Sequence, residues 1–370
     1  MSPRRYAQIV GWGKALPARS MHNREFESLV DTSDEWIRTR TGIVERRVAG
    51  EGETTTSLAI AAARQAIAVA DIDPRRIDLI LVATCTADRL LPGAAPIVQQ
   101  ALGATSSGAV DMNAACAGFM YALVTANGLI ASGTHRRILV VGADTLTRWM
   151  DWKDRRVSIL FGDGAGAVLL EASDLPTGLF ASVLRADGSG ADLLHVPAGG
   201  TACLPTNDTL ARGAHYIQMD GPAVFRFAVQ IIVDSTREVL DAAHLTVEDV
   251  DLFVPHQANR RIIDAAVRTL ELPSDRVFIN LDRYGNTSAA SIPIALTEAI
   301  EGGRLHPGDN ILMSGFGAGL TWGTALFQWG VPQRVPATMP WQTVVHQGLT
   351  ERAARALSVA RRALAIADRA

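Results

Sequence analysis

Short apolar runs alternate along the chain with longer stretches in which apolar and polar residues mix. Near-continuous apolar runs occur at residues 77–83, 137–143 and 251–254. Runs of this length and composition are typical of parallel strands that are covered on both faces. The alanine-rich stretch at 55–70 predicts a long helix after Thr54. The pattern therefore predicts an α/β protein with helices on both faces of its sheets.

The order of these elements occurs twice. Residues 78–82 match 251–254, and residues 137–142 match 310–315. Between each pair lies a short strand, a small-residue turn and a helix, at 110–123 and at 277–296. We infer two tandem α/β units of roughly 160 residues related by a pseudo-twofold axis, in an α-β-α-β-α layered arrangement. The predicted units are 1–175 and 176–330, with the functional site where they meet, at the ends of their strands.

Two terminal regions complete this outline. Residues 6–10 predict a first strand that ends at Gly11-Trp12-Gly13. Residues 331–370 form a third unit, with a proline-containing linker at 331–340 and a weakly amphipathic helix at 350–367. This extension is either a tail, frayed or packed on its own dimer, or a docking element for a partner enzyme or carrier protein.

Composition narrows the setting of the protein. The 370 residues carry a formal net charge of −3, which gives no overall electrostatic reason to expect nucleic acid as a partner. The three cysteines are widely spaced and lack metal-ligand spacing, so we expect no metal site and a reducing, cytoplasmic environment. The N-terminus lacks the apolar run of a signal peptide, and no apolar stretch is long enough to span a membrane.

Cys116 stands at the predicted turn between a short strand, 108–112, and a helix. Small residues flank it (Ala114, Ala115, Ala117 and Gly118), which allows a sharp elbow and leaves the sulfur uncrowded. A thiol at a helix N-terminus lies at the positive end of the helix dipole, which favours the nucleophilic thiolate. The alternative is a buried structural cysteine.

Two polar residues follow strands of the second unit. His256 comes directly after the run 251–254, and Asn286 lies in a Gly-Asn turn before a predicted helix at 288–300. Each could be structural alone, but the duplication places both opposite Cys116. Cysteine with histidine and asparagine is a nucleophilic arrangement that several reactions use. The glycine-rich segment 162–166 is not a phosphate loop, because it continues as a strand instead of opening a helix.

Six ordered motifs then point to one family. They are Asp-Glu-Trp-Ile-Arg-Thr-Arg-Thr-Gly-Ile at 34–43, Ala-Cys-Ala-Gly-Phe at 115–119, Phe-Gly-Asp-Gly-Ala at 161–165, Pro-His-Gln-Ala-Asn at 255–259, Gly-Asn-Thr-Ser at 285–288 and Gly-Phe-Gly-Ala-Gly at 315–319. Over about residues 5–330 the chain resembles the 3-oxoacyl-acyl-carrier-protein synthase III (β-ketoacyl synthase III) family, which has the thiolase fold. The resemblance implies a homodimer that takes an acyl group from coenzyme A onto Cys116. It then condenses that group with malonyl-acyl carrier protein, releasing carbon dioxide.

The resemblance also implies roles for individual residues. Backbone N–H groups of Cys116 and Ala318 form an oxyanion hole, although the family commonly has glycine where this chain has Ala318. His256 and Asn286 donate to the enolate oxygen formed on decarboxylation. Phe316 covers the departing carboxylate with apolar surface. No cofactor is expected, since acyl-coenzyme A and malonyl-acyl carrier protein are substrates.

Substrate contacts follow in the same way. The implied coenzyme A contacts are Thr32, Trp36, Arg40, Arg155 and Asn259. By their charge, Arg260 and Arg261 suit docking of an acidic carrier protein, and the alternative is the solvated start of a helix. Leu91, where many members have phenylalanine, reaches across the dimer to the partner's acyl pocket. The alternatives are a starter-unit acyltransferase or a specialised condensing enzyme of secondary metabolism, and a non-catalytic partner subunit. The sequence does not identify the acyl primer or the pathway.

Overall fold

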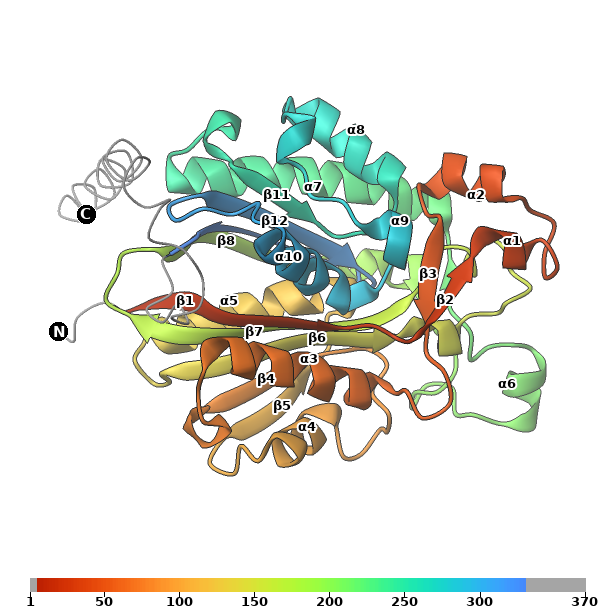
Figure 1. Cartoon of the computed structure of the whole chain (residues 1–370). Helices are drawn as coiled ribbons and strands as arrows, with labels where there is room; N and C mark the ends of the chain where they lie inside the picture. The colour runs from red at the N-terminus through yellow and green to blue at the C-terminus, as the bar shows by residue number, and fades with distance from the viewer. Residues whose placement is uncertain (1–4, 331–370) are drawn as a thin grey trace.

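Two β-sheets, one from each half of the chain, form the centre of the molecule (Figure 1). The computed structural model describes residues 5–330. The first sheet has the order β1-β7-β6-β4-β5, with bounds Tyr6–Ala15, Asp163–Ser173, Arg137–Thr145, Leu79–Ala83 and Gly108–Met112. The second has the order β11-β12-β13-β8, with bounds Leu252–Pro255, Asn310–Gly317, Thr321–Gln328 and Gly178–Ala186.

Helices separate and cover the two sheets. The inner helices are α5 (Gly118–Ala131) and α10 (Ser291–Glu301), whose apolar residues share one core with both sheets. The outer pairs are α3 (Thr55–Ala70) with α4 (Ala94–Leu102) on the first sheet, and α7 (Gly221–Ala243) with α8 (Arg260–Leu270) on the second. Figure 1 shows these five layers from top to bottom. The predicted α-β-α-β-α architecture is confirmed.

The pairing of strands repeats between the halves. The parallel pair β4–β6 corresponds to β11–β12, and the antiparallel pair β6–β7 corresponds to β12–β13. The prediction of a strand at the start of residues 277–296 is wrong. Val277 forms only a single isolated bridge, to Phe253. β5 therefore has no counterpart strand in the second sheet, and it lies at the edge of the first.

The first strand is longer than expected. β1 continues through Gly11 and Gly13 to Ala15, whereas the sequence suggested an end at Gly11. Both glycines lie against α3: a Cβ on Gly11 would overlap the carbonyl oxygen of Ala66, and one on Gly13 would be 2.5 Å from that of Ala62. They are close-approach positions within the strand and not a turn.

Smaller elements gather at one end of the layers (Figure 1). They are β2 (Arg19–His22), α1 (Asn23–Phe26), α2 (Asp34–Thr41), β3 (Glu45–Val48), β9 (Leu194–His195), α6 (Asn207–Ala211), β10 (Gln218–Met219) and α9 (Leu281–Tyr284). Among residues 5–330 no helix is long and apolar enough to cross a membrane. The linker and helix expected at 331–340 and 350–367 lie outside the described residues.

Candidate active site

Cys116 lies in a 3₁₀ turn, Ala115–Ala117, between β5 and α5. Ala115 has a φ of +46°, so the elbow before the sulfur passes through the left-handed region. The end of β12 lies directly against it: a Cβ on Gly317 would be 2.6 Å from the amide nitrogen of Cys116. Only glycine at this position allows a strand of the second half to approach Cys116 so closely.

The electrostatics of Cys116 differ from the expectation. Its side chain is buried, and burial raises the pKa of the thiol to about 12, even though the Ser288 hydroxyl donates to Sγ at 3.4 Å. The direction of this shift favours the thiol over the thiolate in the free site, contrary to the stabilised thiolate that the sequence predicted.

His256 follows β11 and is fully enclosed. Its Nδ1 lies 2.6 Å from Oγ of Ser291, the first residue of α10, and burial lowers the pKa of the imidazole to about 3. Ser291 Oγ also accepts the N–H of Gln257 at 3.4 Å, which directs its own hydrogen towards Nδ1. We therefore assign a neutral imidazole that carries its proton on Nε2. The ring of Phe316 packs edge-on to it, with centroids 5.1 Å apart.

Asn286 is held on both sides. Its backbone N–H donates to Leu160 O, and its own carbonyl accepts from the N–H of Gly162. The side-chain Oδ1 accepts the N–H of Ser288 at 2.9 Å. With its oxygen engaged in this way, the side-chain amide has its NH₂ group available to a substrate.

One pocket of about 450 Å³ brings most of the expected residues together. Cys116, His256, Asn286 and Phe316 line it together with four of the five expected coenzyme A contacts, Trp36, Arg40, Arg155 and Asn259. Apolar side chains complete the wall, among them Leu160, Phe161, Leu194, Met219, Phe225, Phe227 and Leu320. The pocket is thus an apolar cavity with a few polar groups, suited to an acyl thioester.

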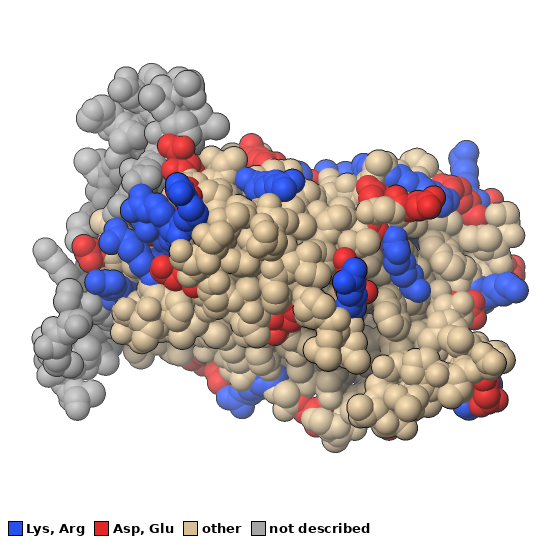
Figure 2. Space-filling view, turned by 90° about the horizontal axis from the view of Figure 1, so that it is seen from below, with Lys and Arg blue, Asp and Glu red and all other residues tan. Residues whose placement is uncertain are grey.

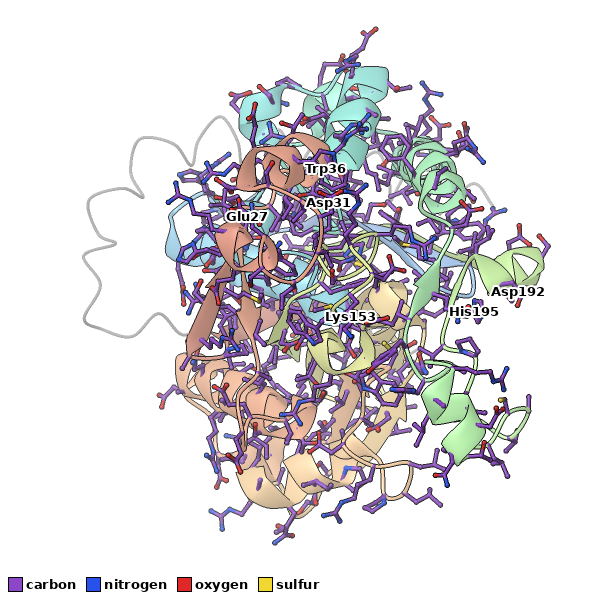
Figure 3. The ribbon with its side chains drawn as sticks, turned by 90° about the vertical axis from the view of Figure 1, so that its right-hand side faces the viewer. Glu27, Asp31, Trp36, Lys153, Asp192 and His195 are labelled. Atoms are coloured by element: carbon purple, nitrogen blue, oxygen red, sulfur yellow. The ribbon has the colours of Figure 1, made fainter. Side chains whose placement is uncertain are left out.

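Two arginines lie against the Trp36 ring. Trp36 and Arg40 belong to α2, and Arg155 lies in the loop after β6. The guanidinium carbon of Arg155 lies 5.0 Å from the Trp36 ring centroid, and that of Arg40 lies 5.8 Å from it. Arg155 also donates to the carbonyl oxygen of Asp31. Figure 3 views this face, with Trp36 and Asp31 on the α1–α2 side and His195 of β9 on the opposite side. The arrangement can hold a flat base against Trp36 and phosphates against the arginines.

Three of the expected residues lie together at the beginning of α8. Asn259, which lines the pocket, caps the helix by accepting the N–H of Arg261 and donates to the carbonyl of Arg40, so it connects α8 to α2. Arg260 and Arg261 lie outside the pocket lining. Arg260 pairs with Asp264 along the helix, and Arg261 lies 5.8 Å from the Phe225 ring centroid.

Thr32, Ala318 and Leu91 are also outside that lining. The Thr32 hydroxyl is buried without a hydrogen-bond partner. The carbonyl of Ala318 accepts from Thr321 Oγ1, which also donates to the carbonyl of Ala114, two residues before Cys116. Leu91 is 83% exposed, so within a single chain it forms no part of the pocket.

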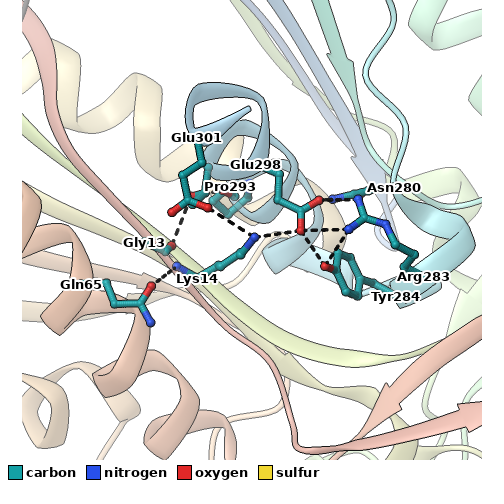
Figure 4. A network of polar contacts seen from close by, with 10 residues as sticks. Gly13, Lys14, Gln65, Asn280, Arg283, Tyr284, Pro293, Glu298 and Glu301 are labelled. Carbon is teal, nitrogen blue, oxygen red and sulfur yellow. Dashed lines mark hydrogen bonds and ion pairs between the residues drawn. The ribbon is translucent and has the colours of Figure 1, made fainter. Parts of the chain in front are cut away.

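A polar network lies next to the Asn286 turn, on the residues that precede it in the chain (Figure 4). Glu298 of α10 pairs with Lys14 of β1 at 2.8 Å and with Arg283 at 2.7 Å, and it accepts the Tyr284 hydroxyl at 2.6 Å. Burial alone would raise the pKa of Glu298, but hydrogen bonds from Lys14, Tyr284 and Asn280 hold it at about 2. The network links the two halves immediately before the Gly-Asn turn.

Three supporting residues escaped the sequence analysis. Ser288 contacts Cys116, Ser291 contacts His256, and Gly317 admits the close approach of β12. Ser288 and Gly317 lie inside quoted motifs, so motif position was an available signal for them. Ser291 carries no such signal, because its partner is 35 residues away in the chain.

Comparisons with known proteins agree with this geometry. The family model described as "3-Oxoacyl-[acyl-carrier-protein (ACP)] synthase III" matches residues 110–188, and the model of its C-terminal part matches residues 240–329. A relative from Roseiflexus castenholzii, named beta-ketoacyl-[acyl-carrier-protein] synthase III, is 51% identical over 324 residues. That alignment covers 88% of this chain and 98% of the relative.

Solved structures agree as well. The crystal structure of 3-oxoacyl-[acyl-carrier-protein] synthase III from Aquifex aeolicus has a TM-score of 0.81 and 44% identity, covering 87% of this chain and 100% of that one. The priming β-ketosynthase of a polyketide biosynthetic pathway has a TM-score of 0.83 and 38% identity, covering 90% of this chain and 98% of that one.

Proposed function

Because this chain belongs to the 3-oxoacyl-[acyl-carrier-protein] synthase III family, we propose that it condenses an acyl-coenzyme A primer with malonyl-acyl carrier protein, with loss of carbon dioxide. The product is a 3-oxoacyl-acyl carrier protein, which starts a fatty-acid or polyketide chain. One observation carries the proposal: Cys116 from the first half shares a single pocket with His256 and Asn286 from the second.

The first step is acyl transfer. Sγ of Cys116 attacks the thioester carbonyl, the bond from carbon to the coenzyme A sulfur breaks, and the cysteine proton leaves with coenzyme A thiol. The backbone N–H groups of Cys116 and Ala318 stabilise the tetrahedral oxyanion. The close packing of Gly317 on Cys116, and the Thr321 hydroxyl that bridges both segments, support this assignment.

The second step is decarboxylation and carbon–carbon bond formation. Loss of carbon dioxide from the malonyl thioester leaves an enolate, whose oxygen accepts from His256 Nε2–H and the Asn286 NH₂ group. The enolate carbon attacks the acyl carbonyl and Cys116 sulfur departs, taking up a proton. A neutral His256 suits this donor role, and the apolar ring of Phe316 disfavours the charged carboxylate that is lost.

Coenzyme A enters past Trp36. The adenine stacks on the indole while Arg40 and Arg155 face the phosphates, and Asn259 contacts the pantetheine arm near α8. Thr32, at the start of the same segment, offers an unpartnered hydroxyl. Acyl carrier protein, which is acidic, docks on Arg260 and Arg261 at the beginning of α8.

The active form is a homodimer. β5 is an unpaired edge whose Val110 is 50% exposed, and Leu90 and Leu91 nearby are 90% and 83% exposed. Figure 2, which views the side on which β5 lies in Figure 1, shows a broad area with few charges. A second copy of the chain would cover these apolar side chains, and Leu91 would then reach the partner's acyl pocket.

The remaining elements of the proposal follow from the chemistry. A thiol and hydrogen-bond donors are the only protein groups that both reaction steps require. The enzyme therefore needs no cofactor in addition to its two substrates. The free thiols at Cys85, Cys116 and Cys203 suit the reducing cytoplasm, and nucleic acid is not a partner. The alternative of a starter-unit acyltransferase or a specialised condensing enzyme of secondary metabolism remains, because one structural relative primes polyketide synthesis.

Intact-mass analysis tests the proposal. Wild-type protein is exposed to a panel of acyl-coenzyme A species and then to malonyl-acyl carrier protein, while carbon dioxide and product are measured. We expect an acyl adduct that Cys116→Ser abolishes and that the control variants Cys85→Ser and Cys203→Ser retain. An adduct that persists in Cys116→Ser would refute the assigned nucleophile. Transfer of the acyl group without carbon dioxide release would favour the acyltransferase alternative.

A further inference from the structure

Asp144 is a buried carboxylate that the two reaction steps do not use. It is the penultimate residue of β6, its side chain is fully enclosed, and Ala289 N–H donates to its Oδ2 at 3.2 Å. Its Oδ1 accepts from Thr84 Oγ1 at 3.0 Å, Cys85 N at 2.9 Å and Thr86 Oγ1 at 2.8 Å. Asp144 therefore connects the end of β4, the end of β6 and the turn that precedes α10.

The directions of these hydrogen bonds show that the side chain is an anion. Thr84 Oγ1 already accepts the N–H of Thr86, and Thr86 Oγ1 accepts the N–H of Thr145, so both hydroxyl hydrogens are directed at Asp144. Every partner is a donor, which is the environment of an ionised carboxylate. Within residues 5–330 no basic side chain comes within salt-bridge distance of it.

The turn that Asp144 holds is the one that contacts the nucleophile. Ala289 directly follows Ser288, whose hydroxyl lies 3.4 Å from Cys116 Sγ and whose φ is +53°. Ser288 N–H in turn fixes the Asn286 side chain. A single carboxylate thus anchors the segment that positions both the enolate donor and the partner of the sulfur.

We propose that Asp144 is a positioning residue, a buried anion that holds the Ser288 turn against Cys116 and places a negative charge near the sulfur. The role rests on the proposed condensation activity, but its electrostatic part concerns the free thiol alone. Burial and the negative charge of Asp144 both raise the pKa of Cys116, whereas Ser288 lowers it. His256 in the same pocket is neutral, the charged side chains of the pocket lining are Arg40, Arg155 and Arg156, and Cys85 Sγ lies 3.5 Å from Asp144 itself.

Asp144→Asn separates this role from a merely structural one, because it should move two measurements in opposite directions. Removing the charge should bring the pH midpoint of Cys116 alkylation by iodoacetamide to lower pH, and a midpoint that is lower by one pH unit makes alkylation at pH 8 about tenfold faster. Loss of the anchor should slow decarboxylation by about ten- to a hundredfold, the range for hydrogen bonds to a charged group. Trypsin places Cys85 and Cys116 in separate peptides, 77–89 and 90–136, so mass spectrometry reads each thiol by itself.

Asp163→Asn is the matched control. Asp163 is equally buried and accepts from Thr147 and from Ala49 N–H, but it does not contact the Ser288 turn. We expect it to leave the Cys116 alkylation profile unchanged. If Asp144→Asn does not fold, Thr84→Val removes one donor and keeps the charge; it should slow decarboxylation severalfold without lowering the alkylation midpoint.

The proposal would be overturned by an alkylation midpoint of Cys116 that does not fall in Asp144→Asn, or by a decarboxylation rate that stays at the wild-type value in Thr84→Val. A parallel loss of alkylation and condensation in Asp144→Asn would also refute it, since that is the signature of general damage. If wild-type protein condenses no substrate of the panel, the proposed function fails, while the alkylation profiles still decide the electrostatic role.

Discussion

Ser291→Ala tests whether the tautomer of His256 limits condensation. The Ser291 hydroxyl is the hydrogen-bond partner of His256 Nδ1, at 2.6 Å, and both side chains are buried. Alanine leaves Nδ1 with no donor, so the proton is no longer restricted to Nε2. The variant should therefore form the acyl-enzyme normally but present the Nε2–H donor to the enolate for less of the time.

The magnitude follows from the lost bond. A hydrogen bond of this kind contributes about 0.5–1.5 kcal/mol, which corresponds to a change of about two- to thirteenfold in the ratio of the two tautomers. We expect decarboxylation of malonyl-acyl carrier protein by preformed acyl-enzyme to slow measurably, by no more than that factor, because the rate follows the fraction of Nε2–H and not the ratio. The assay is single-turnover release of carbon dioxide, with the acyl-enzyme first verified by intact mass.

Ser235→Ala is the matched control. Ser235 is a buried serine of α7 whose hydroxyl lies 2.6 Å from that of Thr324, and it is not among the pocket-lining residues. Both variants should lose comparable thermal stability, but only Ser291→Ala should slow decarboxylation. Wild-type decarboxylation in Ser291→Ala, at equal acyl loading, would refute the tautomer assignment.

Four further outcomes are expected. His256→Ala and Asn286→Ala should still acylate but decarboxylate about 10²–10³ times more slowly, as single-turnover rates will show; a defect in acylation alone would contradict the donor role. Gly317→Ala places a Cβ 2.6 Å from the Cys116 amide nitrogen and should prevent acyl-enzyme formation in intact-mass spectra; normal acylation would show that β12 can move aside. Because the pKa of His256 is lowered to about 3 from 6.5, its stabilising contribution is complete above pH 6.5 and is lost as pH falls towards 3; an imidazole NMR titration near pH 6.5 would contradict this. Leu91→Phe should reduce kcat/KM for isobutyryl- and hexanoyl-coenzyme A relative to acetyl-coenzyme A, since each buried CH₂ contributes about 0.8 kcal/mol; an unchanged acetyl preference would exclude Leu91 from the acyl pocket.

The elements that local pattern determines were predictable from the sequence. α3 begins at Thr55 and ends at Ala70 as expected, because Thr54 caps an alanine-rich stretch with a regular buried face. β4 and β6 follow from apolar runs buried on both sides. The duplicated order of such elements was enough to predict two halves and a site between them.

Interactions across the fold were not predictable in the same way. The path of β1 through Gly11 depends on how closely α3 packs, which no local preference records. Val277 is not part of a strand, and a single bridge joins it to Phe253 of β11. At Gly11 the tertiary packing overrode an interpretation based on a few neighbouring residues.

The chemistry of the site was also only partly predictable from the sequence. The small residues around Cys116 and the turn at Asn286 are enough, by themselves, to nominate these side chains as candidates. The protonation states are a property of the folded molecule, because enclosure by both halves removes water and so raises the pKa of Cys116 and lowers that of His256. The partners that orient these groups, Ser291 and Asp144, are distant in sequence and meet them only where the two sheets face each other.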